Sequence, residues 1–139
     1  MKIGTPKETF PGENRVAMTP DSARQLQKLG YECAIEIGAG AAAGFSDAAY
    51  EAAGVEVIKT PAALWKAADI VAKVRQPDAA ELKRLTKGKT LISFFNPAGN
   101  EDGMALAKSK GANVIAMEMV PRISRAQGRG GGGVFRCRL

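Results

Sequence analysis

Short apolar runs alternate along the chain with longer segments in which apolar residues recur every three to four positions. The runs are rich in Ile, Val and Phe, which favour strands, and they recur at intervals of about 20 residues. This alternation is typical of βαβ units around a parallel sheet. It predicts an α/β fold with a parallel sheet of about six strands and helices on both faces. The predicted strands are residues 2–5, 32–36, 55–58, 70–74, 91–95 and 113–117.

Four segments between these runs carry helix start signals. Thr19 can cap a helix that begins at Pro20, where a missing N–H costs nothing, and Gly30 is suited to a left-handed stop. The same order of a polar cap and a later glycine marks residues 46–54 and 100–111. Thr60 precedes a proline in the same way as Thr19. The sequence therefore predicts helices that start after each of these caps.

The predicted interior contains an apolar stripe and one cysteine. Ala23, Leu26 and Leu29 recur about every three residues and form a stripe that should cover the sheet. Cys33 lies in a strand-like run and is expected to be a buried core residue. Cys137 is far away in the sequence and no CxxC spacing occurs, so neither a metal site nor a redox pair is expected.

The last twelve residues have a different composition from the rest. Five of the first six are glycines, which lose more backbone entropy on ordering than any other residue, and few apolar residues follow. We therefore expect one domain over residues 1–127 and a disordered glycine and arginine tail over residues 128–139. A single Arg-Gly unit is weak evidence for an RNA contact.

Composition and charge narrow the function classes. Apolar residues make up 45% and charged residues 24%, an ordinary globular balance, and no apolar run approaches the roughly 20 residues that span a bilayer. The net charge of +6 includes Arg129, Arg136 and Arg138 in the acid-free tail. The other basic residues are expected to mix with acidic ones without a basic stripe, so nucleic-acid binding is not favoured. The N-terminus shows no leader pattern, which indicates a cytoplasmic or matrix-side location.

A glycine-rich turn at residues 37–44 contains a GxG pattern after a predicted strand. A dinucleotide fingerprint needs a helix directly after the glycines and an acidic residue at the end of the next strand. Here Gly44 and Ser46 break the chain where that helix would have to run. The next strand ends with the basic residue Lys59 in place of an acidic one. The pattern favours a structural turn over a nucleotide site.

Several separated motifs, in order, resemble one family. They are KIGTPKE at 2–8, ENRVAMTP at 13–20, EIGAG at 36–40, GFSD at 44–47 and KVRQP at 73–77. Together they resemble the family that joins alanine dehydrogenases to the NAD-binding alpha subunits of proton-translocating NAD(P) transhydrogenases. The resemblance covers about residues 1–128. It implies a flavodoxin-like first domain, and a Rossmann domain with its own glycine fingerprint that is absent from this chain.

Two positions separate the branches of that family. The alanine dehydrogenase branch uses a lysine and a histidine for proton transfer, and the matching positions here are Arg75 and Asn96. A guanidinium stays charged and cannot act as a base, and the chain contains no histidine. Transhydrogenation passes hydride between two nicotinamide rings and needs no such pair. The resemblance thus favours the transhydrogenase branch, with Arg75 and Asn96 as pocket residues and no residue in a catalytic role.

The resemblance also implies cofactor contacts near the end of the chain. Residues 119–128 resemble the transhydrogenase loop at the nicotinamide end of NAD(H), where Arg122, Ser124 and Gln127 would contact the cofactor. Gln127 would also reach toward the NADP(H)-binding partner. Without the resemblance, the spacing of the basic residues in this segment favours a solvent-exposed turn with no cofactor contact. Arg15 matches a position that holds a substrate carboxylate in the dehydrogenases, and its alternative role is to pin Glu8 or Glu13.

The sequence thus predicts the N-terminal fragment of a transhydrogenase alpha subunit. The complete subunit would bind NAD(H), form a homodimer, and dock on NADP(H)-binding and membrane components at the inner membrane. The fragment alone is expected to be inactive and to bind NAD weakly or not at all. The alternatives are an alanine-type amino-acid dehydrogenase domain and a non-catalytic binding module.

Overall fold

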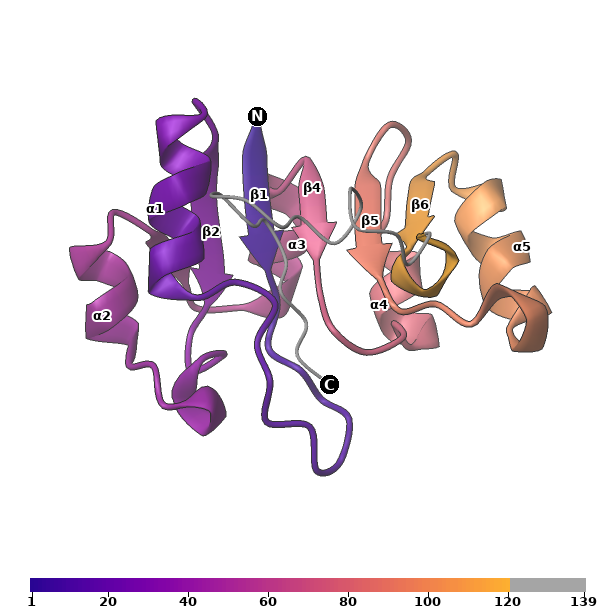
Figure 1. Ribbon diagram of the computed structural model, residues 1–139. Coiled ribbons are helices and arrows are strands. Elements are labelled where there is room, and N and C mark those ends of the chain that lie inside the picture. The colour runs from indigo at the N-terminus through magenta and orange to yellow at the C-terminus, as the bar shows by residue number, and fades with distance from the viewer. Residues whose placement is uncertain (121–139) are drawn as a thin grey trace.

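The computed structural model describes residues 1–120, which form a single parallel sheet covered by helices (Figure 1). The six strands all run in the same direction. They are β1 (Lys2–Thr5), β2 (Glu32–Glu36), β3 (Glu56–Ile58), β4 (Ile70–Ala72), β5 (Thr90–Ser93) and β6 (Asn113–Ala116). The predicted α/β class and six-stranded parallel sheet are confirmed. The expected tail at residues 128–139 lies outside the described residues.

The strand order is β3-β2-β1-β4-β5-β6, so β1 and β4 are neighbours at the centre of the sheet. The chain winds outward from β1 to β3, crosses over, and winds outward again from β4 to β6. This doubly wound order is the one found in dinucleotide-binding sheets, whereas flavodoxin has the order 2-1-3-4-5. In both arrangements a crevice opens at the carboxyl ends of the strands where the winding reverses.

Five helices cover the two faces. They are α1 (Pro20–Lys28), α2 (Asp47–Ala52), α3 (Pro61–Ala67), α4 (Ala79–Lys83) and α5 (Glu101–Ser109). One core cluster joins α1 and α2 to the sheet through Leu26 and Tyr50, and a second joins α3, α4 and α5 through Trp65, Leu82 and Ala107. Right-handed crossovers require this division, because the direction of winding decides the face on which each helix lies.

Local capping explains where the helices begin. Thr19 and Ser22 form a reciprocal capping box at the start of α1, and Ser46, Thr60 and Asn100 each accept a backbone N–H from the first turn of the helix that follows. These four predicted starts are confirmed. The sequence pattern did not predict α4, a five-residue helix with its own capping box.

Two predictions about buried residues have different outcomes. Cys33 is buried as predicted, with a side chain 4% exposed, and burial raises the pKa of its thiol. Leu29 is 66% exposed, so its assignment to the apolar stripe of α1 is wrong. It follows the last helical residue as the C-cap, which points it away from the sheet. The buried stripe of α1 therefore consists of Pro20, Ala23 and Leu26.

Two further observations concern the described residues only. No helix within residues 1–120 is long and apolar enough to cross a membrane. The same residues contain no group of three or more His, Cys, Asp or Glu side chains that could hold a metal ion.

Candidate functional site

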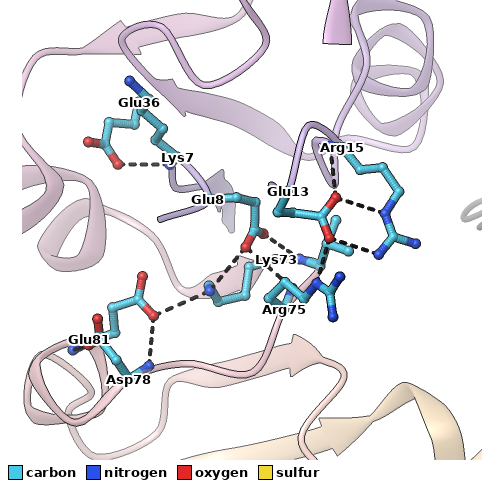
Figure 2. A network of polar contacts seen from close by, with 10 residues as sticks. Lys7, Glu8, Glu13, Arg15, Glu36, Lys73, Arg75, Asp78 and Glu81 are labelled. Atoms are coloured by element: carbon cyan, nitrogen blue, oxygen red, sulfur yellow. Dashed lines mark hydrogen bonds and ion pairs between the residues drawn. The ribbon is translucent and has the colours of Figure 1, made fainter. Parts of the chain in front are cut away.

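The carboxyl ends of β1 and β4 lie side by side, and the loops that follow them meet at the point where the winding reverses. The loop after β1 is long, because α1 starts only at Pro20, and it carries Glu8, Glu13 and Arg15. The segment after β4 carries Lys73 and Arg75. Figure 2 shows that these five side chains converge into one polar network. This network is the centre of the candidate site.

Glu8 ties the two loops together. Its carboxylate accepts the backbone N–H groups of Val74 at 2.5 Å and Arg75 at 3.3 Å, and a hydrogen bond from Nζ of Lys73 at 3.2 Å (Figure 2). Because one carboxylate binds two successive backbone donors, the course of the chain after β4 is fixed by the loop after β1. Glu8 therefore sets the position from which Arg75 projects.

Lys73 is a buried cation between two buried carboxylates. Its side chain is 2% exposed, and Nζ lies 3.2 Å from Oε2 of Glu8 and 3.3 Å from Oε2 of Glu81. Glu81 also accepts the backbone N–H of Asp78 at 3.0 Å, which completes the capping box of α4. Burial raises the pKa of the Glu81 carboxyl, and the Lys73 ammonium acts in the opposite direction. The ion pairs thus join α4 to the strand ends.

Glu13 is held between two guanidinium groups. Its carboxylate accepts hydrogen bonds from Nε and Nη2 of Arg15 at 2.9 and 2.8 Å, and from Nε of Arg75 at 2.6 Å (Figure 2). The Glu13 side chain is only 3% exposed, whereas both arginines are partly open to solvent. The hydrogen bonds from Arg15, with a smaller contribution from Arg75, lower the pKa of Glu13 to about 2. Glu13 therefore remains ionised at neutral pH.

A pocket of about 610 Å³ opens beside this network, toward β5 and β6. One side is built around Arg75, whose guanidinium carbon lies 4.6 Å from the centroid of the Phe10 ring in a cation–π contact. On the other side lie Asn96 and Glu118. The lining residues are Phe10, Arg75, Gln76, Pro77, Asp78, Phe94, Asn96 and Glu118. The pocket combines aromatic faces, carboxamides and charges of both signs, which suits a planar polar group.

Glu118 fixes the far wall of the pocket. Its carboxylate accepts the backbone N–H of Phe95 at 3.0 Å and also that of Asn96. Asn96 has φ of 49°, and within the described residues it alone among non-glycine residues has a positive φ. Successive N–H groups around a left-handed residue form a concave anion-binding nest. Here that nest is filled by the chain's own Glu118, which holds Asn96 at the pocket.

The structure brings together three of the six site residues predicted from the sequence. Arg75 and Asn96 line the same pocket, and Arg15 is joined to Arg75 through Glu13. Arg15 thus pairs with Glu13, one of the two partners expected under its structural role. Arg122, Ser124 and Gln127 lie outside the described residues.

Sequence reasoning did not identify the side chains that position the site. They are Lys73, Glu81 and Glu118, together with Glu8 in its role as a backbone acceptor. For Glu8 and Lys73 there was a signal, because each lies just beyond the end of a central strand, where side chains meet in a parallel sheet.

The glycine-rich turn after β2 has an internal partner. The N–H of Gly38 donates to the Asp47 carboxylate at 2.8 Å, and a short 3-10 helix (Ala41–Ala43) follows. Gly40 is required for packing, because a Cβ there would lie 2.5 Å from a ring carbon of Tyr50. These contacts support the interpretation as a structural turn, since a donor that a phosphate would use is taken by a carboxylate.

Comparison with known proteins identifies a matching family and similar sequences. Residues 4–129 match the family model described as the alanine dehydrogenase/PNT N-terminal domain. The NAD(P) transhydrogenase subunit alpha of Cereibacter sphaeroides is 68% identical over 127 residues, which cover 91% of this chain and 24% of that protein. The alanine dehydrogenase of Bacillus subtilis (strain 168) is 40% identical over 120 residues, or 86% of this chain and 32% of that protein.

A solved structure agrees with these sequence matches. The crystal structure of transhydrogenase from Sinorhizobium meliloti superposes with a TM-score of 0.86 at 38% identity, and the match covers 91% of this chain and 38% of that one. The chain therefore spans about a quarter of the Cereibacter sphaeroides subunit, and well under half of the Sinorhizobium meliloti chain.

Proposed function

Because the chain belongs to the family of alanine dehydrogenase and PNT N-terminal domains, we propose that residues 1–127 are the first domain of a transhydrogenase alpha subunit. The complete subunit would bind NAD(H) and pass hydride between NAD(H) and NADP(H), coupled to proton translocation. The identity supports this branch: 68% to a transhydrogenase subunit against 40% to an alanine dehydrogenase.

The observation that carries the proposal is the pair Arg75 and Asn96 in one pocket. At these two positions the dehydrogenase branch needs groups that take up and release a proton. Arg75 stays charged and its Nε is already bonded to Glu13, while an amide such as that of Asn96 does not titrate. Hydride transfer between two nicotinamide rings moves no substrate proton, so it does not require an acid–base pair at these two positions.

The pocket fits one end of a dinucleotide better than the other. Phe10, Phe94 and the Asn96 carboxamide can contact a flat ring that carries an amide, as nicotinamide does. The glycine turn after β2 does not fit a pyrophosphate, because the N–H of Gly38 is bonded to Asp47. We therefore propose that this domain supplies the nicotinamide side of the NAD(H) site. Arg122, Ser124 and Gln127 remain the proposed cofactor contacts from the segment that follows.

The proposal includes partners and location. The relatives are named as subunit alpha, which implies other subunits. We propose that the complete subunit forms a homodimer and docks on the NADP(H)-binding and membrane components of the transhydrogenase. It would then be peripheral to the inner membrane, on its cytoplasmic or matrix side.

A chimera tests the transhydrogenase assignment directly. Residues 1–127 replace the matching segment of the Cereibacter sphaeroides alpha subunit, and membranes containing the chimera are assayed for hydride transfer from NADPH to an oxidised NAD analogue. We expect activity comparable to that of the unmodified Cereibacter sphaeroides subunit. Loss of transfer in a chimera that still assembles with its partners would contradict the proposal.

The alanine dehydrogenase alternative is tested with the same chimera. No alanine-dependent NADH formation above background is expected, because the acid–base pair is replaced by Arg75 and Asn96. The double variant Arg75→Lys with Asn96→His should recover at most a trace of this activity. Robust alanine oxidation by the unmodified chimera would show that the dehydrogenase assignment is the correct one.

The isolated chain is expected to bind NADH no more tightly than about 1 mM and to transfer no hydride. A charge-assisted hydrogen bond from Arg122 and a neutral one from Gln127 would contribute roughly 2–4.5 kcal/mol before the cost of ordering. A dissociation constant of 1 mM corresponds to about −4 kcal/mol. Calorimetry with NADH measures this, and a constant in the low micromolar range would reveal a cofactor site that these residues do not explain.

A further inference from the structure

The loop after β5 presents one side-chain amide to the pocket from an unusual backbone conformation. Asn96 lies three residues beyond the end of β5 and has φ of 49° and ψ of 62°. Asparagine enters this left-handed region more readily than other residues that have a Cβ, but the conformation persists only where the surroundings fix it. The contacts around Asn96 therefore show what the loop holds in place.

Glu118 fixes the backbone on one side of Asn96. Its carboxylate accepts the N–H of Phe95 at 3.0 Å from Oε1 and 3.2 Å from Oε2, and Oε1 also accepts the N–H of Asn96. Glu118 lies in the 3-10 helix Met117–Met119 directly after β6, which is the neighbour of β5 in the sheet (Figure 1). The Phe95 side chain is fully buried in the core. The backbone at Asn96 is thus held by one carboxylate and one core residue.

Gly99 leaves space for the amide itself. A Cβ on Gly99 would lie 2.6 Å from Nδ2 and 3.4 Å from Oδ1 of Asn96. The amide therefore lies against the backbone of Gly99, whose N–H donates to the carbonyl oxygen of Asn96 at 3.1 Å and closes the turn. A side chain at residue 99 would displace the amide from this position.

The fold itself does not use the Asn96 carboxamide. This amide is exposed at the pocket and has no hydrogen-bond partner within residues 1–120. Asn100, in the same loop, is the opposite case, because its Oδ1 accepts the N–H of Gly103 and its Nδ2 donates to the carbonyl oxygen of Phe95. One asparagine of the loop therefore caps α5, while the other keeps one acceptor and two donors available to a ligand.

We propose that the Asn96 carboxamide binds the carboxamide of the nicotinamide ring, with Glu118 and Gly99 as its positioning residues. Two planar amides can exchange an N–H···O bond in each direction. A nicotinamide ring that turns over about its bond to the ribose carries its carboxamide to the opposite side, so a fixed amide partner selects the ring face that is open to hydride. This inference rests on the proposed function of the pocket as the nicotinamide side of the site.

Nuclear magnetic resonance of the isotope-labelled 139-residue chain tests the contact without any hydride transfer. The probes are nicotinamide and 3-methylpyridine, which has a similar ring without the carboxamide. We expect the side-chain amide signals of Asn96 to shift with nicotinamide and to shift much less with 3-methylpyridine. Asn96→Gly removes the amide and suits the left-handed φ, so it should weaken nicotinamide binding by about two- to tenfold without loss of stability. Absence of the Asn96 shift, or equal shifts with the two probes, would overturn the proposal.

Two variants test the positioning residues while the amide is kept. Glu118→Gln removes the charge and one of the two acceptor oxygens, and Gly99→Ala places a methyl group where the amide lies. Each should weaken nicotinamide binding about as much as Asn96→Gly, whereas the matched control Glu51→Gln, on the exposed surface of α2, should leave it unchanged. A folded Gly99→Ala variant that bound nicotinamide like the unmodified chain would contradict the positioning role.

The chimera described above adds a stereochemical readout. With deuterium-labelled NADPH as donor, the unmodified chimera should label one face of the nicotinamide ring of the NAD analogue, and Gly99→Ala should label both. Transfer to a single face in the variant, with an unchanged KM, would overturn the assigned role. An inactive chimera would contradict the proposed function alone, because the resonance shifts report the amide contact independently of hydride transfer.

Discussion

Replacing Lys73 with methionine should destabilise the domain strongly. The side chain is 2% exposed, and its ammonium is the cation shared by Glu8 and Glu81, which are themselves 3% and 6% exposed. Methionine keeps most of the volume but leaves two carboxylates buried without a counter-charge. Removing one partner of a buried ion pair costs about 3–5 kcal/mol. That is a large share of the roughly 5–15 kcal/mol by which a domain of this size is stable.

The pH dependence of this loss gives a second readout. Burial raises the pKa of Glu81, and Lys73 opposes that rise, so its removal should raise the pKa further. A carboxyl whose pKa rises on folding contributes stability below its unfolded pKa of about 4.5, and this contribution is lost as pH rises through the folded pKa. The deficit of the variant should therefore be largest near neutral pH and should shrink toward pH 4.

Urea unfolding followed by circular dichroism at several pH values measures both effects. Lys2→Met is the matched control, because Lys2 pairs with Glu56 at 2.7 Å on the surface and should contribute less than about 1 kcal/mol. The reasoning would be refuted if Lys73→Met lost no more free energy of unfolding than this control. It would also fail if the deficit grew as the pH was lowered.

Three further predictions concern stability and can be measured by the same unfolding assay. Lys89→Met should cost about 1–3 kcal/mol, since three carbonyl oxygens at the end of α3 lose their donor, and no measurable loss would contradict this role. Gly40→Ala should cost about 1–3 kcal/mol, because its Cβ would lie 2.5 Å from the Tyr50 ring, and unchanged stability would show that the turn can move aside. For Glu13→Gln, folding lowers the pKa of the native carboxyl from 4.5 to about 2, so the stability advantage of the unmodified chain should be present above pH 4.5 and lost as pH falls toward 2. An advantage that did not change between those pH values would exclude this ion-pair effect.

The sequence predicted the features that depend on local chemistry. A cap such as Thr19 or Ser46 accepts a backbone N–H two or three residues away. A short stretch of sequence therefore determines where a helix starts. The strands follow from apolar runs in the same way. Helix α4 was missed because it has only five residues, too few for apolar periodicity to show.

The candidate site could be predicted only in part, because its contacts are distant in sequence. Arg75 and Asn96 were found through motifs. Glu8 binds the N–H of Val74 across 66 positions, and Glu118 binds the N–H of Asn96 across 22. When a carboxylate accepts backbone N–H groups, the segment that it binds cannot be recognised from its residue types, since every residue except proline offers the same N–H. Only the strand order shows which loop ends meet.

The loop after β1 explains why a sheet with this strand order can lack a dinucleotide site of its own. In nucleotide-binding sheets of the same order, a tight glycine turn joins β1 directly to a helix whose N-terminus faces the pyrophosphate. Here a long loop separates β1 from α1, and it places Glu8 and Glu13 at the point where the winding reverses. These carboxylates bind the backbone donors and cations of the crevice, so those groups are not free to hold a diphosphate. We therefore expect a ligand to enter on the β5 side, where Arg75, Asn96 and Glu118 line a pocket with space for a flat polar ring. Such a domain can complete a cofactor site by enclosing one end of a dinucleotide that another domain holds.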